Sequence, residues 1–238
     1  MTFRSFIAWA VACSALPAAA LLIRPDRDDA EYLELASRYT SSIALGATAG
    51  EGVLLNRRWI LTAAHRARPL GDASAPRIHL GKDSYEVAEV FLHPGWKGGA
   101  ENDIALVRLK QEVLGIEPTP MYRGTDEGGK AVAIAGHGGG KKRAAINTVD
   151  RVTPLTLGLF VKPLDEASDL QGQATAAESG APAYVEIDGE ILVAGILQGV
   201  TGNWETYARV SAFAPWIEET MLRVARKEAD KLMGSVSN

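Results

Sequence analysis

The sequence predicts an all-β fold in which two antiparallel six-stranded β-barrels pack together, followed by a C-terminal α-helix. Three observations support this prediction. From Ser41 onwards, short apolar runs alternate with clusters of Gly, Pro, Asn and Asp, a pattern typical of short strands joined by tight turns. The segment 115–130 is poor in aliphatic residues and divides these runs into two equal sets. A single clear helical pattern stands at the end of the chain.

The apolar runs divide into six strands before the dividing segment and six after it. We therefore expect a first barrel over residues 41–120 and a second over 121–212. The first set is Ser42–Leu45, Glu51–Leu55, Trp59–Thr62, Arg77–Leu80, Tyr85–Leu92 and Ile104–Leu109. The second set is Ala131–Ala135, Ala144–Val152, Leu157–Val161, Ala183–Ile187, Ile191–Gln198 and Glu205–Val210.

Residues 213–238 are predicted to form the C-terminal helix. Between Phe213 and Met233, apolar residues recur at helical spacing with charged residues between them. Pro215 suits a first helical turn, and acidic residues precede basic ones along the segment, as the helix dipole favours. We expect this helix to dock on its own domain rather than to bind a membrane.

Residues 1–20 have the pattern of an export signal. Arg4 precedes an apolar run from Phe6 to Leu16, and Ala18 to Ala20 supply the small residues that signal peptidase requires. This run is too short for a permanent membrane anchor, which needs about 20 residues. The chain is therefore predicted to be exported, periplasmic or secreted. A buried N-terminal helix and a lipoprotein signal acylated at Cys13 are the alternatives.

Residues 21–40 are predicted to be an N-terminal extension, with a charged stretch followed by a short helix at Glu31–Arg38. Composition excludes several other classes for the whole chain. Its 238 residues carry 25 Lys plus Arg and 29 Asp plus Glu, which argues against a nucleic-acid partner. With Cys13 as its one cysteine and no spaced pair of histidines, the chain is expected to hold no disulfide, metal or other cofactor. The oligomeric state is left open.

Two segments of the first half carry candidate catalytic residues. In Arg58–His65, an apolar run typical of a buried strand is followed by two alanines and then by His65 at the strand end. The imidazole of His65 is suited to proton transfer near neutral pH. Asp103 directly precedes the apolar run at Ile104. Its carboxylate could cap a turn, or it could accept the N–H of a catalytic histidine and fix the orientation of the ring.

The third candidate is Ser179, within the turn Glu178-Ser179-Gly180-Ala181-Pro182. A serine in a tight turn of small residues can expose its hydroxyl and present neighbouring backbone N–H groups together. An ordinary turn serine is the alternative for this residue. Each of the three segments is a weak signal alone, and their occurrence in the order His, Asp, Ser strengthens all three.

These segments resemble the motifs of trypsin-like (chymotrypsin-fold) serine proteases. Arg58–His65 is similar to the histidine motif of that family over its whole length, and Asn102–Leu109 resembles its aspartate motif. Where the family reads Gly-Asp-Ser-Gly-Gly-Pro, this chain has Ala177-Glu178-Ser179-Gly180-Ala181-Pro182. The likeness extends from about Ser41 to Ile217.

The resemblance implies an endopeptidase that acts on peptide or protein substrates through an acyl-enzyme. Ser179 would attack the carbonyl, His65 would transfer the proton, and Asp103 would hold His65. Backbone N–H groups of Ala177 and Ser179 would bind the oxyanion. Four further positions would contact the substrate by the same resemblance: Gln173, Gln198, Gly199 and Val200.

The chain departs from the family pattern in three ways. Ala177 stands where the family usually has glycine, so its Cβ restricts the backbone of the oxyanion loop. The family's Ile-Val-Gly-Gly N-terminus is absent, and Glu178 replaces the aspartate that pairs with its amine. Gln173 stands where members specific for basic residues have aspartate, which favours a neutral or unusual preference.

These departures leave two other functions open. The chain could be a binding domain that keeps the fold and the triad residues without a working oxyanion hole. It could also be an esterase that uses the same site, because an ester carbonyl reacts with the same groups.

Overall fold

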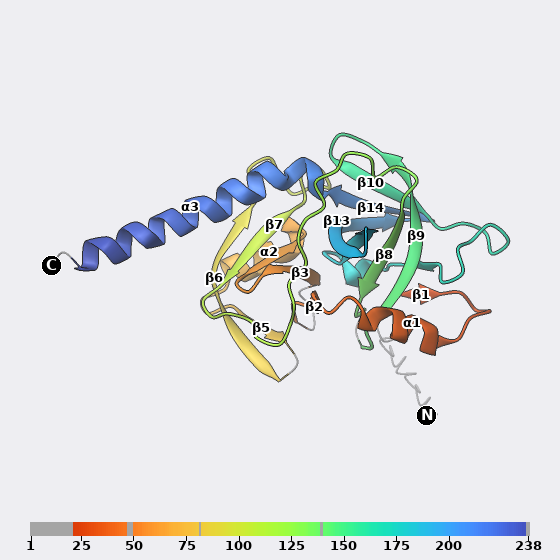
Figure 1. The fold of residues 1–238 in the computed structure, drawn as a ribbon, viewed down its shortest axis with the longest axis horizontal. Helices are drawn as coiled ribbons and strands as arrows, with labels where there is room; N and C mark the ends of the chain where they lie inside the picture. The colour runs from red at the N-terminus through yellow and green to blue at the C-terminus, as the bar shows by residue number, and fades with distance from the viewer. Residues whose placement is uncertain (1–20, 47–49, 81, 139, 237–238) are drawn as a thin grey trace, which may run out of the picture.

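The structure is a computed structural model, and it describes residues 21–46, 50–80, 82–138 and 140–236. The predicted signal peptide, residues 1–20, lies outside the described residues. Two six-stranded β-sheets lie side by side, and a long C-terminal helix runs past the first of them (Figure 1). The fold class predicted from the sequence is therefore confirmed.

The first sheet has the strand order β2-β3-β4-β7-β6-β5, with antiparallel pairing throughout. It is nearly closed, because the edge strands β2 and β5 lie close to each other without pairing. Its strands are β2 (Ser42–Ala44), β3 (Glu51–Asn56), β4 (Trp59–Thr62), β5 (Arg77–Leu80), β6 (Asp83–Leu92) and β7 (Ala105–Leu109).

The second sheet is a closed antiparallel barrel with the order β10-β14-β13-β12-β8-β9. Its strands are β8 (Ala131–Gly136), β9 (Arg143–Val152), β10 (Thr156–Phe160), β12 (Pro182–Ile187), β13 (Glu190–Thr201) and β14 (Trp204–Arg209). Each strand of both sheets overlaps one that the apolar runs predicted.

Apolar side chains form a core inside each sheet and a third cluster between them. Leu54, Ile60 and Val107 are completely buried in the first sheet, and Leu157 and Tyr207 are completely buried in the second. The third cluster joins residues of both sheets to the first turns of the C-terminal helix, and its members include Leu61, Leu106, Ile196, Phe213 and Ile217. The two sheets therefore share a continuous apolar contact.

The extension that precedes the first sheet packs on the second barrel. Strand β1 (Leu22–Ile23) pairs with β11 (Gly172–Gln173), and α1 (Asp29–Ser37) lies against β9. A capping box between Asp28 and Glu31 begins α1. At the first residue of α1, Asp29 forms an ion pair with Arg143, with 2.5 Å between Oδ1 and Nε. These contacts hold the extension next to the loop that leads to Ser179.

Helix α2 (Ala64–Asp72) was not predicted. The prediction that His65 stands at the end of a strand is wrong. His65 lies in the first turn of α2, which continues through Pro69 and buries Ala64, Ala67 and Leu70. Arginines and a proline concealed this short helix, because its buried face consists mainly of alanine.

The C-terminal helix α3 (Val210–Val236) begins three residues earlier and ends three residues later than its predicted apolar pattern. Its first turns are buried through Phe213 and Ile217, whereas Leu222, Leu232 and Met233 are exposed. The far end of α3 extends beyond the two sheets (Figure 1). Among the described residues, no helix combines the length and apolar character that crossing a membrane requires.

Candidate active site

Neighbouring strands bring His65 and Asp103 together. Thr62, at the end of β4, pairs with Ala105, at the start of β7, so the residues beyond these two strand ends emerge side by side. His65 follows the first strand by three residues, and Asp103 precedes the second by two. The side chains therefore meet at one edge of the first sheet.

The Asp103 carboxylate binds both N–H groups that His65 directs toward it. The backbone N–H of His65 donates to Oδ1 at 2.9 Å, and the ring Nδ1 lies 2.6 Å from Oδ2. The first bond caps the N-terminus of α2, where Ala63 offers no capping side chain. The Asp103 side chain is only 4% exposed, and its carboxylate holds the Nδ1–H of the His65 ring. Nε2 is then the basic nitrogen of the ring, and it faces away from Asp103.

Ser179 lies in a tight turn between the 3₁₀ helix η1 (Ala176–Glu178) and strand β12. Gly180 has φ +92°, and a Cβ at this position would collide with the Glu51 carbonyl and the Thr62 hydroxyl. The carbonyl of Ser179 accepts the N–H of Glu51 at 2.9 Å. The second barrel thus places Ser179 against β3 and β4, close to the start of α2.

The hydroxyl of Ser179 is held within its own turn. Its Oγ donates to the carbonyl of Ala176 at 3.0 Å, and its backbone N–H donates to the same oxygen at 3.4 Å. Within the described part of the chain, no hydrogen bond joins Ser179 to the ring of His65. The structure therefore joins His65 to Asp103, and it directs both donors of Ser179 into η1.

Arg66, the residue after His65, also binds the carbonyl of Ala176. Its Nη2 donates to that oxygen at 2.6 Å, which links α2 directly to the turn of Ser179. Ala177 lies in the same turn, and its φ is not positive. Arg66 was not among the residues predicted for the site, and its place directly after His65 is the one signal in the sequence that could have found it.

Glu178 is completely buried directly before Ser179. Its Oε1 accepts the backbone N–H of Leu21 at 3.0 Å, and its Oε2 accepts that of Thr175 at 2.7 Å. Burial, together with the nearby carboxylate of Glu51, raises the pKa of Glu178 to about 8. The side chain therefore contacts the start of the described chain, a contact that sequence reasoning missed because it joins distant residues.

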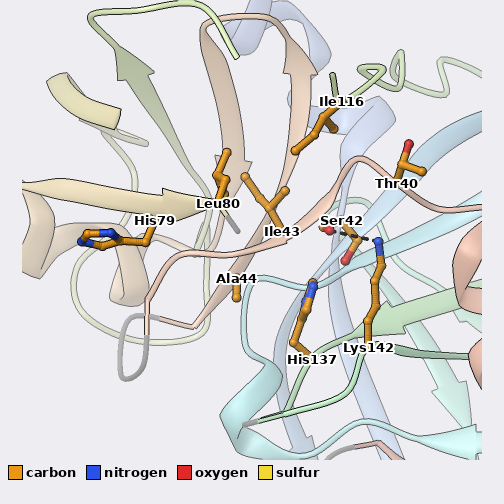
Figure 2. Close-up of a pocket in the computed structure, with 9 residues that line it drawn as sticks. All are labelled: Thr40, Ser42, Ile43, Ala44, His79, Leu80, Ile116, His137 and Lys142. Atoms are coloured by element: carbon orange, nitrogen blue, oxygen red, sulfur yellow. Dashed lines mark hydrogen bonds between the residues drawn. The ribbon is translucent and has the colours of Figure 1, made fainter. Parts of the chain in front are cut away.

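Glu51 connects this region to the loop after β8. Its Oε1 accepts the backbone N–H of His137 at 2.6 Å and that of Gly138 at 3.0 Å. The His137 ring and Lys142 line a cavity of about 360 Å³ beside β2 (Figure 2). Lys142 donates to the carbonyls of Tyr39 and Ser42, and burial lowers its pKa to about 8. Lys142 thus ties β9 to the chain that enters the first sheet.

The four positions predicted to contact substrate lie on β11 and β13. Gln173 donates to the carbonyl of Gly202 at 2.6 Å. Gln198 is 8% exposed, and its Nε2 donates to the backbone carbonyl of Asp103 at 3.4 Å. Gly199 and Val200 follow it as half-buried residues, and a Cβ at Gly199 would meet nothing within 4 Å. The open space beside Gly199 lies next to Gln198, which touches Asp103.

Two other titratable side chains, His93 and Glu205, are packed among structural residues. The ring of His93 packs edge-on against Phe213 and Trp216, and burial lowers its pKa. Glu205 is fully buried and accepts hydrogen bonds from Ala174, Tyr207 and Asn147, and burial raises its pKa to about 7. In the described ranges, no group of three or more His, Cys, Asp or Glu is arranged to hold a metal ion.

Comparisons with known proteins agree with this architecture. A family model described as Trypsin matches residues 30–217. Complement C1s subcomponent of Sus scrofa is 28% identical over 232 residues, which cover 75% of this chain and 33% of that protein. Serine protease SP24D of Anopheles gambiae is 28% identical over 196 residues, covering 72% of each chain. Vitamin K-dependent protein C of Mus musculus is 23% identical over 205 residues, covering 70% of this chain and 45% of that protein.

Proposed function

Because the chain belongs to the trypsin family of serine proteases, we propose that it is an exported serine endopeptidase that uses Ser179, His65 and Asp103. The observation that carries this proposal is the pair of hydrogen bonds from His65 to the buried carboxylate of Asp103. A carboxylate on Nδ1 leaves Nε2 as the base, which is the arrangement that nucleophilic acyl transfer requires.

Ser179 has to reach His65 for the first step. Arg66 adjoins His65 in sequence and binds the carbonyl that holds the Ser179 hydroxyl, so the two segments are already in contact. When that carbonyl turns away, the hydroxyl becomes free to donate to Nε2 of His65. The same movement frees the Ser179 N–H, which is one of the two proposed oxyanion donors.

The reaction then proceeds in two acyl-transfer steps. Oγ of Ser179 attacks the peptide carbonyl carbon while Nε2 of His65 takes the hydroxyl proton. The imidazolium, stabilised by Asp103, returns this proton to the leaving amine as the C–N bond breaks. Water, deprotonated by His65, then attacks the ester of Ser179, and the proton returns to Oγ as the acyl group leaves.

Substrate would lie along β13, next to Asp103. The open side of Gly199 can accept an extended peptide backbone, with Gln198 and Val200 as its neighbours. Gln173 is neutral, so we propose a preference for neutral side chains over lysine or arginine at the cleaved bond. Peptide and protein chains are the proposed partners.

We also propose that residues 1–20 are removed as a signal peptide and that the new amine of Leu21 pairs with Glu178. The backbone nitrogen of Leu21 lies 3.0 Å from Oε1 of Glu178, and both residues are buried. Cleavage after Ala20 would turn this amide into an ammonium group. Glu178, which forms no ion pair with a described residue, would thereby gain a cation at hydrogen-bond distance, without an Ile-Val-Gly-Gly sequence.

An idle binding domain is the second candidate, and one observation favours it. Both donors of Ser179 are bound to the Ala176 carbonyl, so one of the two proposed oxyanion donors is already occupied in this arrangement. An esterase that uses the same residues is a third candidate, because an ester carbonyl accepts the same attack. Peptide and ester substrates offered to one preparation separate these possibilities.

A fluorophosphonate probe tests the proposal, because it reacts covalently with an activated serine. We expect the protein lacking residues 1–20 to be labelled, and Ser179→Ala to abolish the labelling. Ser37→Ala is the matched control, because Ser37 is exposed on α1 and its hydroxyl binds only the carbonyl of Glu34 among the described residues. Equal labelling of the Ser179→Ala and wild-type proteins would remove Ser179 from its role.

Turnover of a peptide library then distinguishes the protease from the binding domain. Cleavage by the wild type that is lost in His65→Ala supports the endopeptidase. Binding of peptides without cleavage, unaffected by His65→Ala, would favour the idle domain.

A further inference from the structure

One carbonyl oxygen at the candidate active site receives three hydrogen-bond donors. The Ala176 carbonyl accepts Oγ of Ser179 at 3.0 Å, N of Ser179 at 3.4 Å and Nη2 of Arg66 at 2.6 Å. Acyl transfer requires the first donor, Oγ of Ser179, at His65, and the second, N of Ser179, at the oxyanion. The third has no part in that chemistry, and it is the shortest of the three.

Space for the Arg66 side chain is provided by Gly50. A Cβ on Gly50 would lie 2.7 Å from both Cγ and Cδ of Arg66 and 2.6 Å from the carbonyl oxygen of Ser179. Gly50 also has φ +78°, a conformation that other residues rarely adopt. The stem of Arg66 is therefore confined between the backbone before β3 and the turn of Ser179.

The guanidinium of Arg66 has few other partners. Its Nε is buried without a hydrogen bond to any described residue, and no carboxylate of the described ranges forms an ion pair with it. Arg68, two residues later on α2, instead lies near Asp72 on the surface. The bond to the Ala176 carbonyl is thus the main polar anchor of Arg66, and it is a charge-assisted one.

We infer that Arg66 is a positioning residue that latches the Ala176 carbonyl over Ser179 and keeps the site at rest. This inference rests on the proposed function and adds a regulation of the same site. While the latch is closed, the hydroxyl and the N–H of Ser179 both donate to the Ala176 carbonyl. Rotation of the Ala176–Ala177 peptide opens the latch, breaks all three bonds and frees both donors of Ser179 at once.

Ala177 adds a second restraint on this rotation. Turning a peptide plane by about half a circle changes ψ of the residue before it and φ of the residue after it by similar amounts. The φ of Ala177, which is not positive here, would move into the positive region that a Cβ disfavours. Arg66 and Ala177 therefore oppose opening through different physical effects, one by a bond and one by backbone strain.

Labelling rates test the latch. Arg66→Met keeps the stem against Gly50 and removes the guanidinium, so we expect fluorophosphonate labelling to accelerate by roughly tenfold to a hundredfold, the range set by one charge-assisted hydrogen bond. Ala177→Gly should accelerate labelling by roughly tenfold, because glycine adopts positive φ freely. Arg68→Met, on the exposed side of the same helix, is the matched control and should leave the rate unchanged.

Thermal denaturation separates a latch from a purely structural role. A latch predicts that Arg66→Met lowers the Tm of the free protein while it raises the labelling rate. Loss of both stability and labelling in Arg66→Met would overturn the inference, because Arg66 would then support the reactive arrangement. An unchanged rate in Arg66→Met would overturn it as well.

The inference can fail independently of the proposed function. If the wild type is labelled and Arg66→Met is not faster, the protease proposal stands and the latch is wrong. If no variant is labelled, the protease proposal fails, and a crystal structure of Arg66→Met decides the latch. An Ala176 carbonyl turned away from Ser179 in that structure would support it, and an unchanged orientation would refute it.

Discussion

The charge at the N-terminus should decide how the stability of this protein depends on pH. We compare a chain that begins with the free amine of Leu21 with one in which Gly-Ser precedes Leu21. The extended chain places a neutral amide 3.0 Å from Oε1 of Glu178, whereas the free amine places an ammonium group there. Both chains bury the same Glu178 side chain.

The pKa of Glu178 sets the magnitude of the effect. Beside an amide, burial raises this pKa from 4.5 to about 8, and such a rise corresponds to up to about 5 kcal/mol. Because the folded state holds the proton more tightly than the unfolded state, the extended chain is most stable at low pH. Its free energy of unfolding falls as the pH rises from 4.5 toward 8.

In the free-amine chain, we expect Glu178 to cause no such fall in the free energy of unfolding. Its ammonium group favours the ionised carboxylate, so the pKa of Glu178 falls and Glu178 causes no loss of stability through neutral pH. The carboxylate in turn raises the pKa of the amine above its ordinary value of about 8. The stabilisation by this ion pair is lost only as the pH rises through that raised pKa. The two chains should therefore differ most near pH 8.

Urea denaturation at pH 5 and pH 8 measures the difference. We expect both chains to have similar free energies of unfolding at pH 5, and the extended chain to be weaker by several kcal/mol at pH 8. Glu178→Gln in the extended chain should remove the part of the pH dependence that Glu178 causes and leave the part that Glu205 causes, which both chains share. Identical losses of stability in the two chains between pH 5 and pH 8 would refute the pairing of Leu21 with Glu178.

Three further predictions concern stability elsewhere. Gly180→Ala should lower the free energy of unfolding by about 3 kcal/mol, measured in urea, because the Cβ collides with Glu51 and Thr62 at φ +92°; a loss below about 1 kcal/mol would contradict the tight turn. Arg209→Met should lower the free energy of unfolding by about 3–5 kcal/mol in urea, because it leaves the completely buried Glu127 without its cation. The double variant with Glu127→Gln should recover part of this free energy, and no recovery would contradict the ion pair. Deleting residues 229–238 should change the Tm by less than about 2 °C. The side chains described in this segment are exposed, and the ion pair of Glu228 with Arg108 lies before it. A larger drop in Tm would mean that the end of α3 packs against the rest of the protein.

Much of the fold could be predicted because each strand carries its own apolar run. Trp59–Thr62 and Arg77–Leu80 are strands with the bounds that the pattern predicted. Strand β1 was missed because it has two residues, and it exists only through pairing with β11, far away in sequence. Helix α2 was missed because Pro69 and two arginines hide its narrow buried face.

The candidate site could be predicted in part. Residue types and order pointed to His65, Asp103 and Ser179, and the contact between the first two follows from the pairing of β4 with β7. The orientation of the Ser179 hydroxyl depends on one peptide plane, which no sequence pattern encodes. The catalytic roles and the oxyanion donors stay predictions that the experiments above address, and the domain boundaries stay predictions as well.

The contact between Leu21 and Glu178 has a consequence for the timing of folding. These residues are 157 positions apart, so the contact closes a loop that contains the entire first sheet and half of the barrel. Closing a loop of this length costs conformational entropy. We therefore expect the contact to form late, after other structure has offset that cost. If residues 1–20 are removed as proposed, the chain would therefore complete its first sheet before Leu21 docks against Glu178.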